Sequence, residues 1–292
     1  MVSFDVPEPD YDRYTNRQLV VVPLLVLTIA LVIIVGMWAL TGAPATLGIE
    51  FTGGTELTVD TASSEAEIEN AFGDNLENIR DVDTPDERYI LTFSSGENLQ
   101  QQAESALEPV SSDQEVVDGV RDFSPTFAAD TQQMAIMGLV AAFLGMSVIA
   151  FLLFRTFIPS IAIVISAFSD IMIPLAMMNV LGIELSLGTV AALLMLIGYS
   201  VDSDILLNTH ILRRGGGDFY ESTYRAMQTG VTMTVTSMAA MATMAVVATV
   251  FGINLLGSIG LILFIGLAAD LMNTYLLNLS LLRWYKFEGV KR

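Results

Sequence analysis

The stretch Leu187–Thr209 reads LGTVAALLMLIGYSVDSDILLNT. Its first half, up to Ile197, carries no charge, and the whole stretch is longer than the about 20 apolar residues that a helix needs to cross a bilayer. Asp202 and Asp204 nevertheless lie in its second half. A carboxylate at membrane depth costs roughly 2.5–3.5 kcal/mol on insertion scales, so it is by default a candidate functional group. The stretch therefore predicts a membrane span that carries a site.

Five further stretches are long and apolar enough to span a bilayer, namely residues 19–41, 134–154, 158–180, 229–251 and 256–282. The chain of 292 residues is 53% hydrophobic with a mean hydropathy of +0.59, which is too apolar for a soluble domain of this length. The first span is too long for a cleavable signal, and no small-residue cleavage site follows a basic start. These features predict a polytopic α-helical membrane protein with six spans.

The basic residues predict the orientation of these spans. Of the 13 Lys and Arg residues, all but Arg80, Arg88 and Arg121 fall in the tails 1–18 and 283–292 or in the loops after the second and fourth spans. Because Lys and Arg are enriched in cytoplasmic loops, both tails are expected to be cytoplasmic and the long segment 42–130 to lie outside.

The segment 42–130 is strongly acidic, with 20 Asp and Glu residues against 3 Arg, a net charge of −17 out of the chain's −19. Such a surface would not attract nucleic acid. Two interpretations stay open: a surface that seeks cations or basic partners, and a solvated acidic shell adapted to high salt. The acids are scattered and not clustered, which favours the second interpretation and a halophilic source. The chain has no cysteine and one histidine, His210, so disulfides and a structural zinc site are excluded, and no metal or cofactor is expected.

The same segment is predicted to fold. Strand patterns at Gly54–Asp60, Asn78–Val82, Arg88–Phe93 and Glu115–Asp122 alternate with helical patterns at Ser64–Phe72 and Glu97–Leu107, and a turn is expected at Asp83–Asp86. The order β-α-β-β-α-β is that of a ferredoxin-like α+β sandwich. An irregular loop of about 90 residues would be uncommon.

Several polar residues fall inside the predicted spans. Asp170 lies about 18 Å along the third span, near the middle of the membrane, and Asp270 lies in the sixth. In the fourth span, Ser200, Asp204 and Asn208 recur at every fourth residue and share one face of the helix. Asp202 points about 160° away from Asp204, because a helix has about 3.6 residues per turn. The two acids cannot both face one partner.

The fifth span carries a stripe of hydroxyls at Thr229, Thr232 and Thr236, which serves either to pack helices or to line a proton or water path. Arg225 precedes it, at about the depth of the span-four acids. We expect Asp204 to face the threonine stripe and Asp202 to lie nearer Arg225. The four aspartates outnumber this arginine, which favours a proton or ion pathway over a static structural role. The alternative is that Asp202 and His210 lie in the headgroup region and are ordinary.

Three ordered motifs carry a resemblance to a known family. Gly48–Gly54, just after the first span, resembles the G-[IL]-D-F-x-G-G signature of the SecD/SecF protein-export family. Gly198–Asp204 is similar to the fourth-span motif GYS-x-N-D-T, and Arg225–Thr232 to R-T-x-N-T-S-x-T at the start of span five. Asp170 matches an aspartate of the third span. The matching signature residues are Gly48, Glu50, Phe51, Gly53, Gly54 and Tyr199.

The resemblance implies half of a resistance–nodulation–division architecture, and six spans with one small domain fit the SecF branch. It further implies a SecD partner, a SecY-type channel, secretory proteins as clients and the proton gradient as energy source. The span-four aspartate of bacterial members aligns with Ser203 here, between Asp202 and Asp204, which leaves open which acid carries the coupling. Glu50 stands where the family has aspartate and keeps the charge.

Other functions are weighed against this one. A small-solute or lipid exporter of the same superfamily would need a partner half, and a proton-independent scaffold for SecD would need no titrating acid. Ser200 and His210 are about 15 Å apart on one helix, so an intramembrane hydrolase is disfavoured. The sequence has no Walker motif, so no nucleotide-binding site for ATP hydrolysis is expected. The chain is therefore expected not to be an enzyme, and to contact protein partners and membrane lipid.

Overall fold

The computed structural model describes residues 11–82, 88–94, 98–111, 114–212 and 219–289. The chain divides into two compact units. The helical unit comprises residues 1–46, 137–245 and 258–292, and the sheet unit comprises residues 47–136 and 246–257. The expected turn at Asp83–Asp86 lies outside the described residues.

Among the described residues, six helices are long and apolar enough to cross a membrane, which confirms the predicted fold class. They are α1 (Asn16–Thr41), α5 (Pro125–Phe154), α6 (Phe157–Leu181), α7 (Leu187–Leu212), α8 (Phe219–Val250) and the segment Asn254–Phe287 that begins with α9. Several begin earlier or end later than the apolar windows in the sequence. Helices continue past their apolar stretch wherever the flanking residues can close backbone hydrogen bonds, so hydropathy marks their middle better than their ends.

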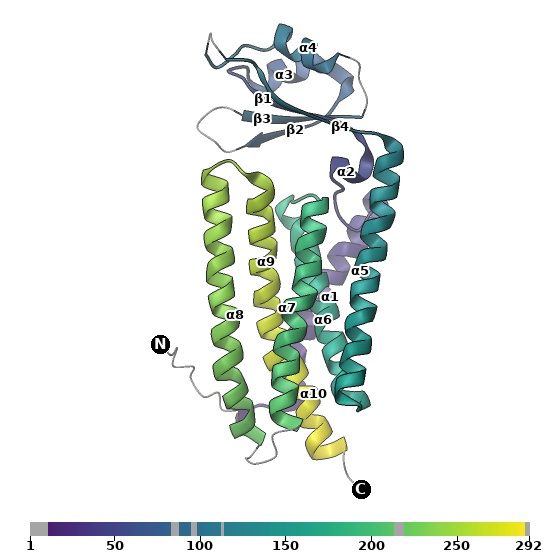
Figure 1. Cartoon of the computed structure of the whole chain (residues 1–292), viewed down its shortest axis with the longest axis vertical. Coiled ribbons are helices and arrows are strands. Elements are labelled where there is room, and N and C mark those ends of the chain that lie inside the picture. Colours follow the sequence, from purple (N-terminus) through teal and green to yellow (C-terminus); the bar gives the residue numbers. More distant parts are fainter. Residues whose placement is uncertain (1–10, 83–87, 95–97, 112–113, 213–218, 290–292) are drawn as a thin grey trace. The chain divides into compact units, whose positions relative to one another are not determined.

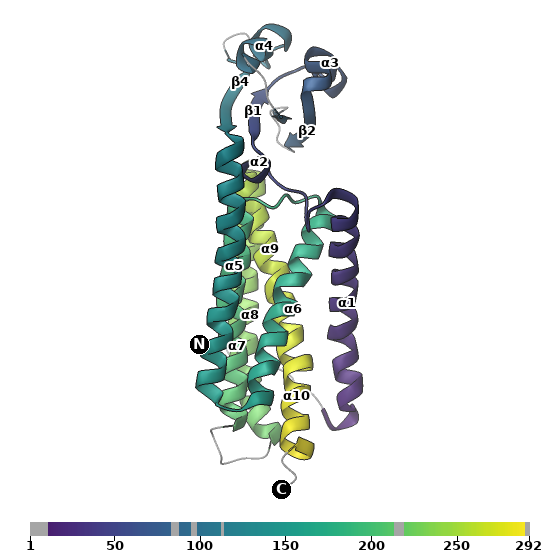
Figure 2. The same cartoon turned by 90° about the vertical axis from the view of Figure 1, so that its right-hand side faces the viewer.

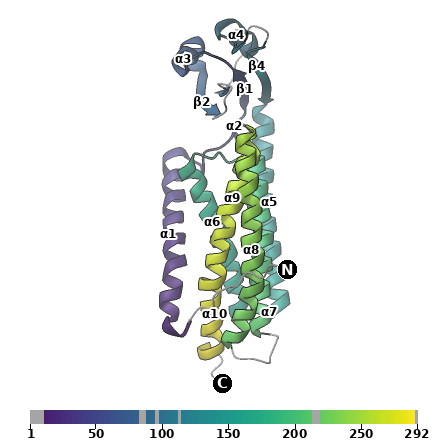
Figure 3. The same cartoon turned by 90° about the vertical axis from the view of Figure 1, so that its left-hand side faces the viewer.

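Helix α6 is the most enclosed helix of the helical unit. In its apolar window 67% of residues are buried, against 11% in α5 and in α8. It packs against α1, α7 and the sixth span, and Figures 2 and 3 show α1 and α6 running side by side. Proline 174 lies within α6, and the helix continues through it to Leu181. Asp170, a polar residue of α6, is accordingly buried, at 1% exposed.

The sixth span changes its helical form along its length. After α9 (Asn254–Met272) comes a π-helical segment, η3 (Asn273–Asn278), then α10 (Leu279–Trp284) and a second π-helical segment, η4 (Tyr285–Gly289). Five of the six residues of η3 are buried. A π-turn inside a longer helix is uncommon and frequently lies at a functional site, because it re-aims the side chains that follow it.

The sheet unit contains the predicted β-α-β-β-α-β order. Strands β1 (Gly54–Asp60), β2 (Leu76–Val82), β3 (Arg88–Phe93) and β4 (Val117–Phe123) form an antiparallel sheet in the order β2-β3-β1-β4. Helices α3 (Glu65–Phe72) and α4 (Leu99–Ala106) cover one face of this sheet (Figure 1). Leu57, Ile68, Leu91 and Phe93 are fully buried between the two layers.

Two adjacent glycines of the Gly48–Gly54 motif, Gly53 and Gly54, have a backbone function in this unit. The motif forms the short helix α2 (Ile49–Thr52), with Gly48 before it and Phe51 buried. Gly53 and Gly54 both have positive φ, at 78° and 123°. A Cβ on Gly54 would collide with the carbonyl oxygen of Phe93. The glycine pair is therefore required for the chain to enter β1, since other residues rarely adopt such angles.

Candidate functional site

Three buried carboxyl groups meet inside the helical unit. Asp170 on α6, Asp204 on α7 and Asp270 on α9 are 1%, 0% and 2% exposed. Serine, threonine and asparagine side chains of α7 and the sixth span hold all three. We call these acids and their hydrogen-bond donors the carboxyl cluster; it consists of Asp170, Ser200, Ser203, Asp204, Asp270, Asn273, Thr274 and Asn278.

Asp170 receives one donor from each neighbouring helix. The hydroxyl of Ser200 donates to its Oδ2 at 2.6 Å, and Nδ2 of Asn273 donates to its Oδ1 at 2.6 Å. The first contact joins α6 to α7, and the second joins α6 to the π-helical segment η3. The acid near the middle of span three is thereby tied to both spans that carry the other two acids.

Asp204 faces the sixth span. Nδ2 of Asn278 donates to its Oδ1 at 2.7 Å, and Oγ1 of Thr274 donates to the same atom at 3.0 Å. Its Oδ2 has no hydrogen-bond partner in the described part of the chain, and neither has the amide of Asn208 one turn further on. Ser200, Asp204 and Asn208 are all at most 1% exposed, as expected for residues on one buried face of α7.

In the described part of the chain, Asp270 accepts hydrogen bonds from hydroxyl groups alone. Ser203 Oγ lies 2.8 Å from its Oδ1 and 3.0 Å from its Oδ2, and Thr274 Oγ1 lies 3.3 Å from Oδ1. Because Thr274 also contacts Asp204, one hydroxyl bridges two carboxyl groups. Ser203 occupies the position where bacterial relatives are expected to carry aspartate, and here it contacts an aspartate of another helix.

The cluster contains no positive charge. Within the described ranges, no Lys, Arg or His nitrogen forms an ion pair with any of the three carboxyls. Transferring a carboxylate from water into a protein interior costs several kcal/mol unless a cation or a sufficient set of donors replaces the water. The donors present are neutral, so the cluster is suited to hold protons or to exchange them.

A small cavity borders the cluster between α7, α8 and α9. Its volume is about 170 Å³, which is enough for several water molecules. Ser203 and Asp270 line it together with Tyr199, Asp202, Leu206, Gly230, Met233, Thr234, Ser237 and Leu267. Figures 1 and 3 show α8 and α9 running next to each other. Asp270 borders this cavity, whereas Asp170 is not among the residues that line it.

Two expectations about the partners of the acids are wrong. Asp202 is exposed and makes no hydrogen bond or ion pair with Arg225, whose guanidinium instead pairs with Glu221 one turn earlier on α8. That pair is itself exposed, at 67% and 52% of the two side chains. Glu221 lies four residues away on the same helix, so it competes with any partner on α7 for the guanidinium.

The threonine stripe also lies elsewhere than expected. Thr229 and Thr236 are exposed, and the hydroxyls of Thr232 and Thr236 donate to the carbonyls of Gln228 and Thr232 on their own helix. Asp204 therefore faces η3 and not this stripe. A threonine within a helix can satisfy its hydroxyl through the carbonyl four residues back, so a hydroxyl stripe need not mark a polar face. Thr234 and Ser237 are the hydroxyls of α8 that reach the cavity.

Asn278 is a cluster residue that the sequence analysis missed. It lies eight residues after Asp270 and four after Thr274, so an i, i+4, i+8 pattern like that of Ser200, Asp204 and Asn208 was present in the sixth span. Of the other signature residues, Tyr199 lines the cavity, whereas Gly48, Phe51, Gly53 and Gly54 belong to the entry of β1. Glu50 also lies in α2.

Comparisons with known proteins agree with this architecture. A family model described as protein export membrane protein SecD/SecF, C-terminal, matches residues 102–288, and one described as SecD/SecF GG motif matches residues 38–65. Proteins named protein-export membrane protein SecF from Haloferax volcanii and Haloquadratum walsbyi are 59% and 61% identical, each over 100% of both chains. One from Pyrococcus furiosus is 37% identical over 94% of this chain and 93% of its own.

A solved structure has the same fold. The crystal structure of SecDF from Thermus thermophilus, titled a translocon-associated membrane protein, matches with a TM-score of 0.73 at 19% identity. The match covers 96% of this chain but 39% of the SecDF chain. This chain thus spans about two fifths of the length of that structure.

Proposed function

The chain belongs to the SecF branch of the SecD/SecF family of protein-export membrane proteins, and on that premise we propose that proton movement through its carboxyl cluster drives protein export. It is a multi-pass membrane protein and an auxiliary component of the Sec translocase. We propose further that it acts with a SecD partner and a SecY-type channel on secretory proteins, without enzymatic activity of its own. Both termini would be cytoplasmic and the sheet unit outside, as the distribution of basic residues suggests.

The observation that carries the proposal is the set of three carboxyls that are buried without a cation among the described residues. If their role were only to hold helices together, asparagine or serine would do so without the cost of burying an ionisable group. Carboxyl groups at membrane depth are retained where a charge must change. A fixed arginine would strongly stabilise the ionised carboxylate. The neutral donors around these three carboxyls stabilise the ionised form less, so the protonated form stays accessible. This leaves a proton exchangeable.

The contacts suggest the order of events. A proton arriving from the cavity binds Asp270, whose carboxyl then donates to the Thr274 hydroxyl. Thr274 donates its own proton to Oδ1 of Asp204, 3.0 Å away, and is restored when its hydroxyl rotates. A protonated Asp204 is a weaker acceptor for Asn278, so the contact between α7 and η3 loosens. Binding of the proton thus favours a second arrangement of the bundle, as any ligand shifts a two-state equilibrium by its differential affinity.

Arg225 stays outside this path. The family motif suggests a role for it, but its exposed ion pair with Glu221 leaves it no contact with the three acids in this arrangement. A role for Arg225 would require the second arrangement of the bundle.

Export in cells tests the proposal. The genomic copy is replaced by Asp170→Asn, Asp204→Asn or Asp270→Asn, and release of a secretory precursor is followed with and without an ionophore that collapses the proton gradient. Each variant is expected to export like the wild type treated with ionophore, with no further loss when ionophore is added. Asp130→Asn, at an exposed position of α5, is the matched control and should respond to ionophore like the wild type.

Two results would redirect the interpretation. Wild-type export that is insensitive to ionophore but lost on deletion of the protein would indicate a scaffold for SecD. Ionophore-sensitive export in all three aspartate variants and in their combination would remove the carboxyl cluster from the mechanism.

A further inference from the structure

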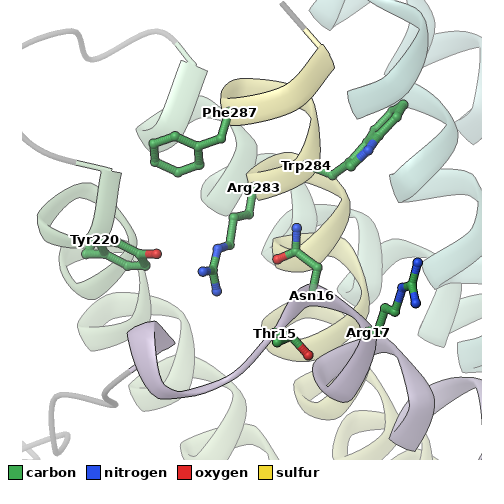
Figure 4. Close-up of a pocket in the computed structure, with 7 residues that line it drawn as sticks. All are labelled: Thr15, Asn16, Arg17, Tyr220, Arg283, Trp284 and Phe287. Carbon is green, nitrogen blue, oxygen red and sulfur yellow. The ribbon is translucent and has the colours of Figure 1, made fainter.

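A second, larger pocket lies in the helical unit, at the end where α1 begins and the sixth span finishes. Its volume is about 870 Å³. It is lined by Thr15, Asn16, Arg17, Tyr220, Arg283, Trp284 and Phe287, from α1, α8, α10 and η4 (Figure 4). None of these lining residues is acidic, and two of them are arginines. Nothing in the export mechanism above uses this pocket.

Arg283 is held in place with part of its guanidinium left available. Its Nη1 donates to the carbonyls of Tyr11 and Tyr14, both at 3.0 Å, and its Cζ lies 5.8 Å from the centre of the Tyr220 ring. No described residue accepts from its Nε or Nη2, which form one straight edge of the guanidinium. Figure 4 shows the side chain extending into the pocket between Tyr220 and Asn16. A free two-donor edge matches two oxygens of a phosphate.

The start of α1 adds a second cationic group and free backbone donors. Arg17 is exposed and bonds to no described residue. The backbone N–H groups of Asn16 and Arg17 lie in the first turn of α1, beyond the capping contacts between Thr15 and Gln18. The first N–H groups of a helix have no partner within it and favour an anion. These groups line one pocket, with the Arg17 side chain on the other side of Asn16 from Arg283 (Figure 4).

The surroundings indicate that the anion is carried by a lipid. Trp284 and Phe287 at the pocket are 43% and 52% exposed, as aromatic side chains are at a membrane interface. Directly beyond Arg17, α1 exposes Val21, Leu24 and Leu25 at 56%, 42% and 54%. A headgroup phosphate in the pocket would leave its acyl chains along this apolar face. A free phosphate would gain nothing from these apolar side chains.

We propose that this pocket binds the headgroup of an anionic phospholipid, with Arg283 holding the phosphate, Arg17 adding a second positive charge to the pocket, and Trp284 and Phe287 bordering the glycerol region. A lipid seated here bridges α1 to the end of the sixth span. The proposal depends on the geometry of the pocket alone, and it holds whether or not the carboxyl cluster carries protons.

Native mass spectrometry of the purified full-length protein in detergent tests this site. The protein is titrated with phosphatidylglycerol or phosphatidylcholine, and the dissociation constant is measured for the wild type and for variants. Arg17→Gln removes a side chain that bonds to no described residue, and Arg283→Lys keeps the charge but loses the two-donor edge. Arg155→Gln is the matched control, because it removes one positive charge from a turn of the same unit that is not part of the pocket.

The expected result is tighter binding of phosphatidylglycerol than of phosphatidylcholine by the wild type. Arg283→Lys should weaken phosphatidylglycerol binding by about tenfold, because a charge-assisted hydrogen bond to the phosphate is lost. Arg17→Gln should also weaken it, but by less, because Arg17 adds positive charge to the pocket without sharing the Arg283 edge. Arg155→Gln should bind like the wild type. Equal affinity for the two lipids, or equal losses in all three variants, would overturn the site. Displacement of the lipid by inorganic phosphate or glycerol phosphate at millimolar concentration would overturn its assignment to lipid.

Discussion

Thr274 connects Asp270 and Asp204, the first and last acids of the proposed proton path. Its hydroxyl is fully buried and lies within hydrogen-bond distance of both Asp204 and Asp270. A hydroxyl can accept a proton from one carboxyl while it donates to the other, whereas the amide of Asn278 can only donate to Asp204. The threonine, and not the asparagine, is therefore the link between the acids.

Thr274→Val is expected to slow gradient-driven export by about tenfold, because it removes a hydrogen bond worth roughly 1.5–3 kcal/mol at an ionisable group while keeping the side chain's shape. The measurement is the rate of precursor release in cells. Thr236→Val makes the same chemical change on the exposed face of α8, where the hydroxyl bonds only to its own helix, and it should leave the rate unchanged. Equal rates in the two variants would contradict the relay.

How far the sequence predicts the site can be judged from single residues. Helical spacing placed Ser200, Asp204 and Asn208 together and Asp202 apart, because the angle between residues on one helix follows from its geometry alone. The same spacing could not tell which neighbouring helix each face would meet. That depends on how α8 and the sixth span are rotated, and the π-helical turn at Asn273–Asn278 alters this rotation. The expected contacts of Asp204 with the threonine stripe and of Asp202 with Arg225 failed for this reason.

Helices α8 and α9 approach each other closely at a glycine. A Cβ on Gly260 of α9 would lie 2.9 Å from the backbone nitrogen of Ala245 and 3.0 Å from the carbonyl oxygen of Met241, both on α8. Small residues at such crossings allow backbones to pack closely in membranes. This contact packs α9 against α8, and both helices contribute residues to the lining of the small cavity.

Gly260→Ala should destabilise the bundle by about 1–3 kcal/mol, because the backbone of α8 must move to admit the methyl group. Unfolding in detergent, followed by loss of helical circular dichroism on heating, measures this effect. Gly145→Ala in α5 is the control: its Cβ would meet nothing within 4 Å, so it should be neutral or slightly stabilising. A melting temperature for Gly260→Ala at or above that of Gly145→Ala would show that the crossing is not tight.

The start of α3 in the sheet unit makes a pH-dependent contact. The backbone N–H and the hydroxyl of Ser64 both donate to Oε2 of Glu67, each at 2.8 Å. These two bonds, the backbone one foremost, lower the pKa of Glu67 below its ordinary value. Because the pKa of Glu67 is lower in the folded state than in the unfolded state, the contact stabilises the helix fully at pH values above the unfolded-state pKa. This stabilisation is lost as the pH falls through the folded-state pKa.

A carbon-13 shift titration of labelled Glu67 should therefore show a midpoint below that of an unperturbed glutamate, and Ser64→Ala should move the midpoint upward. Because Glu67 is fully exposed, its effect on global stability should be too small to detect. An unchanged midpoint in Ser64→Ala would mean that the capping contact does not form in solution.

Taken as a whole, the molecule separates its charges between its two units. The segment 42–130 carries a net charge of −17 out of the chain's −19. The similar proteins from Haloferax volcanii and Haloquadratum walsbyi have genus names that refer to salt. The sequence predicted the ferredoxin-like strand order of this segment because its apolar alternation is regular and its turns are well marked. Among its described residues the buried acids are Glu56 and Asp60, which are paired with Arg121 and Arg88, so the exposed acids produce most of the self-repulsion.

This charge predicts that the sheet unit is stabilised by salt. The Debye screening length falls from about 10 Å at 0.1 M to about 3 Å at 1 M ionic strength. Most of the repulsion between exposed carboxylates is therefore removed at high salt. Limited proteolysis of the purified full-length protein should cut within residues 47–136 more slowly at high KCl than at low KCl, while cleavage of the helical unit changes little. A salt-independent rate would favour a surface built to bind cations or basic partners instead.

Proton flux is the most direct test of the central claim that the carboxyl cluster carries protons. The protein is reconstituted with the proposed SecD partner in liposomes that contain a pH-sensitive dye, and acidification of the lumen is followed after a pH step. The account predicts flux in the wild type and in Asp130→Asn, and its loss in Asp204→Asn and in Asp270→Asn. Flux at the wild-type rate in the Asp204→Asn/Asp270→Asn double variant would contradict it.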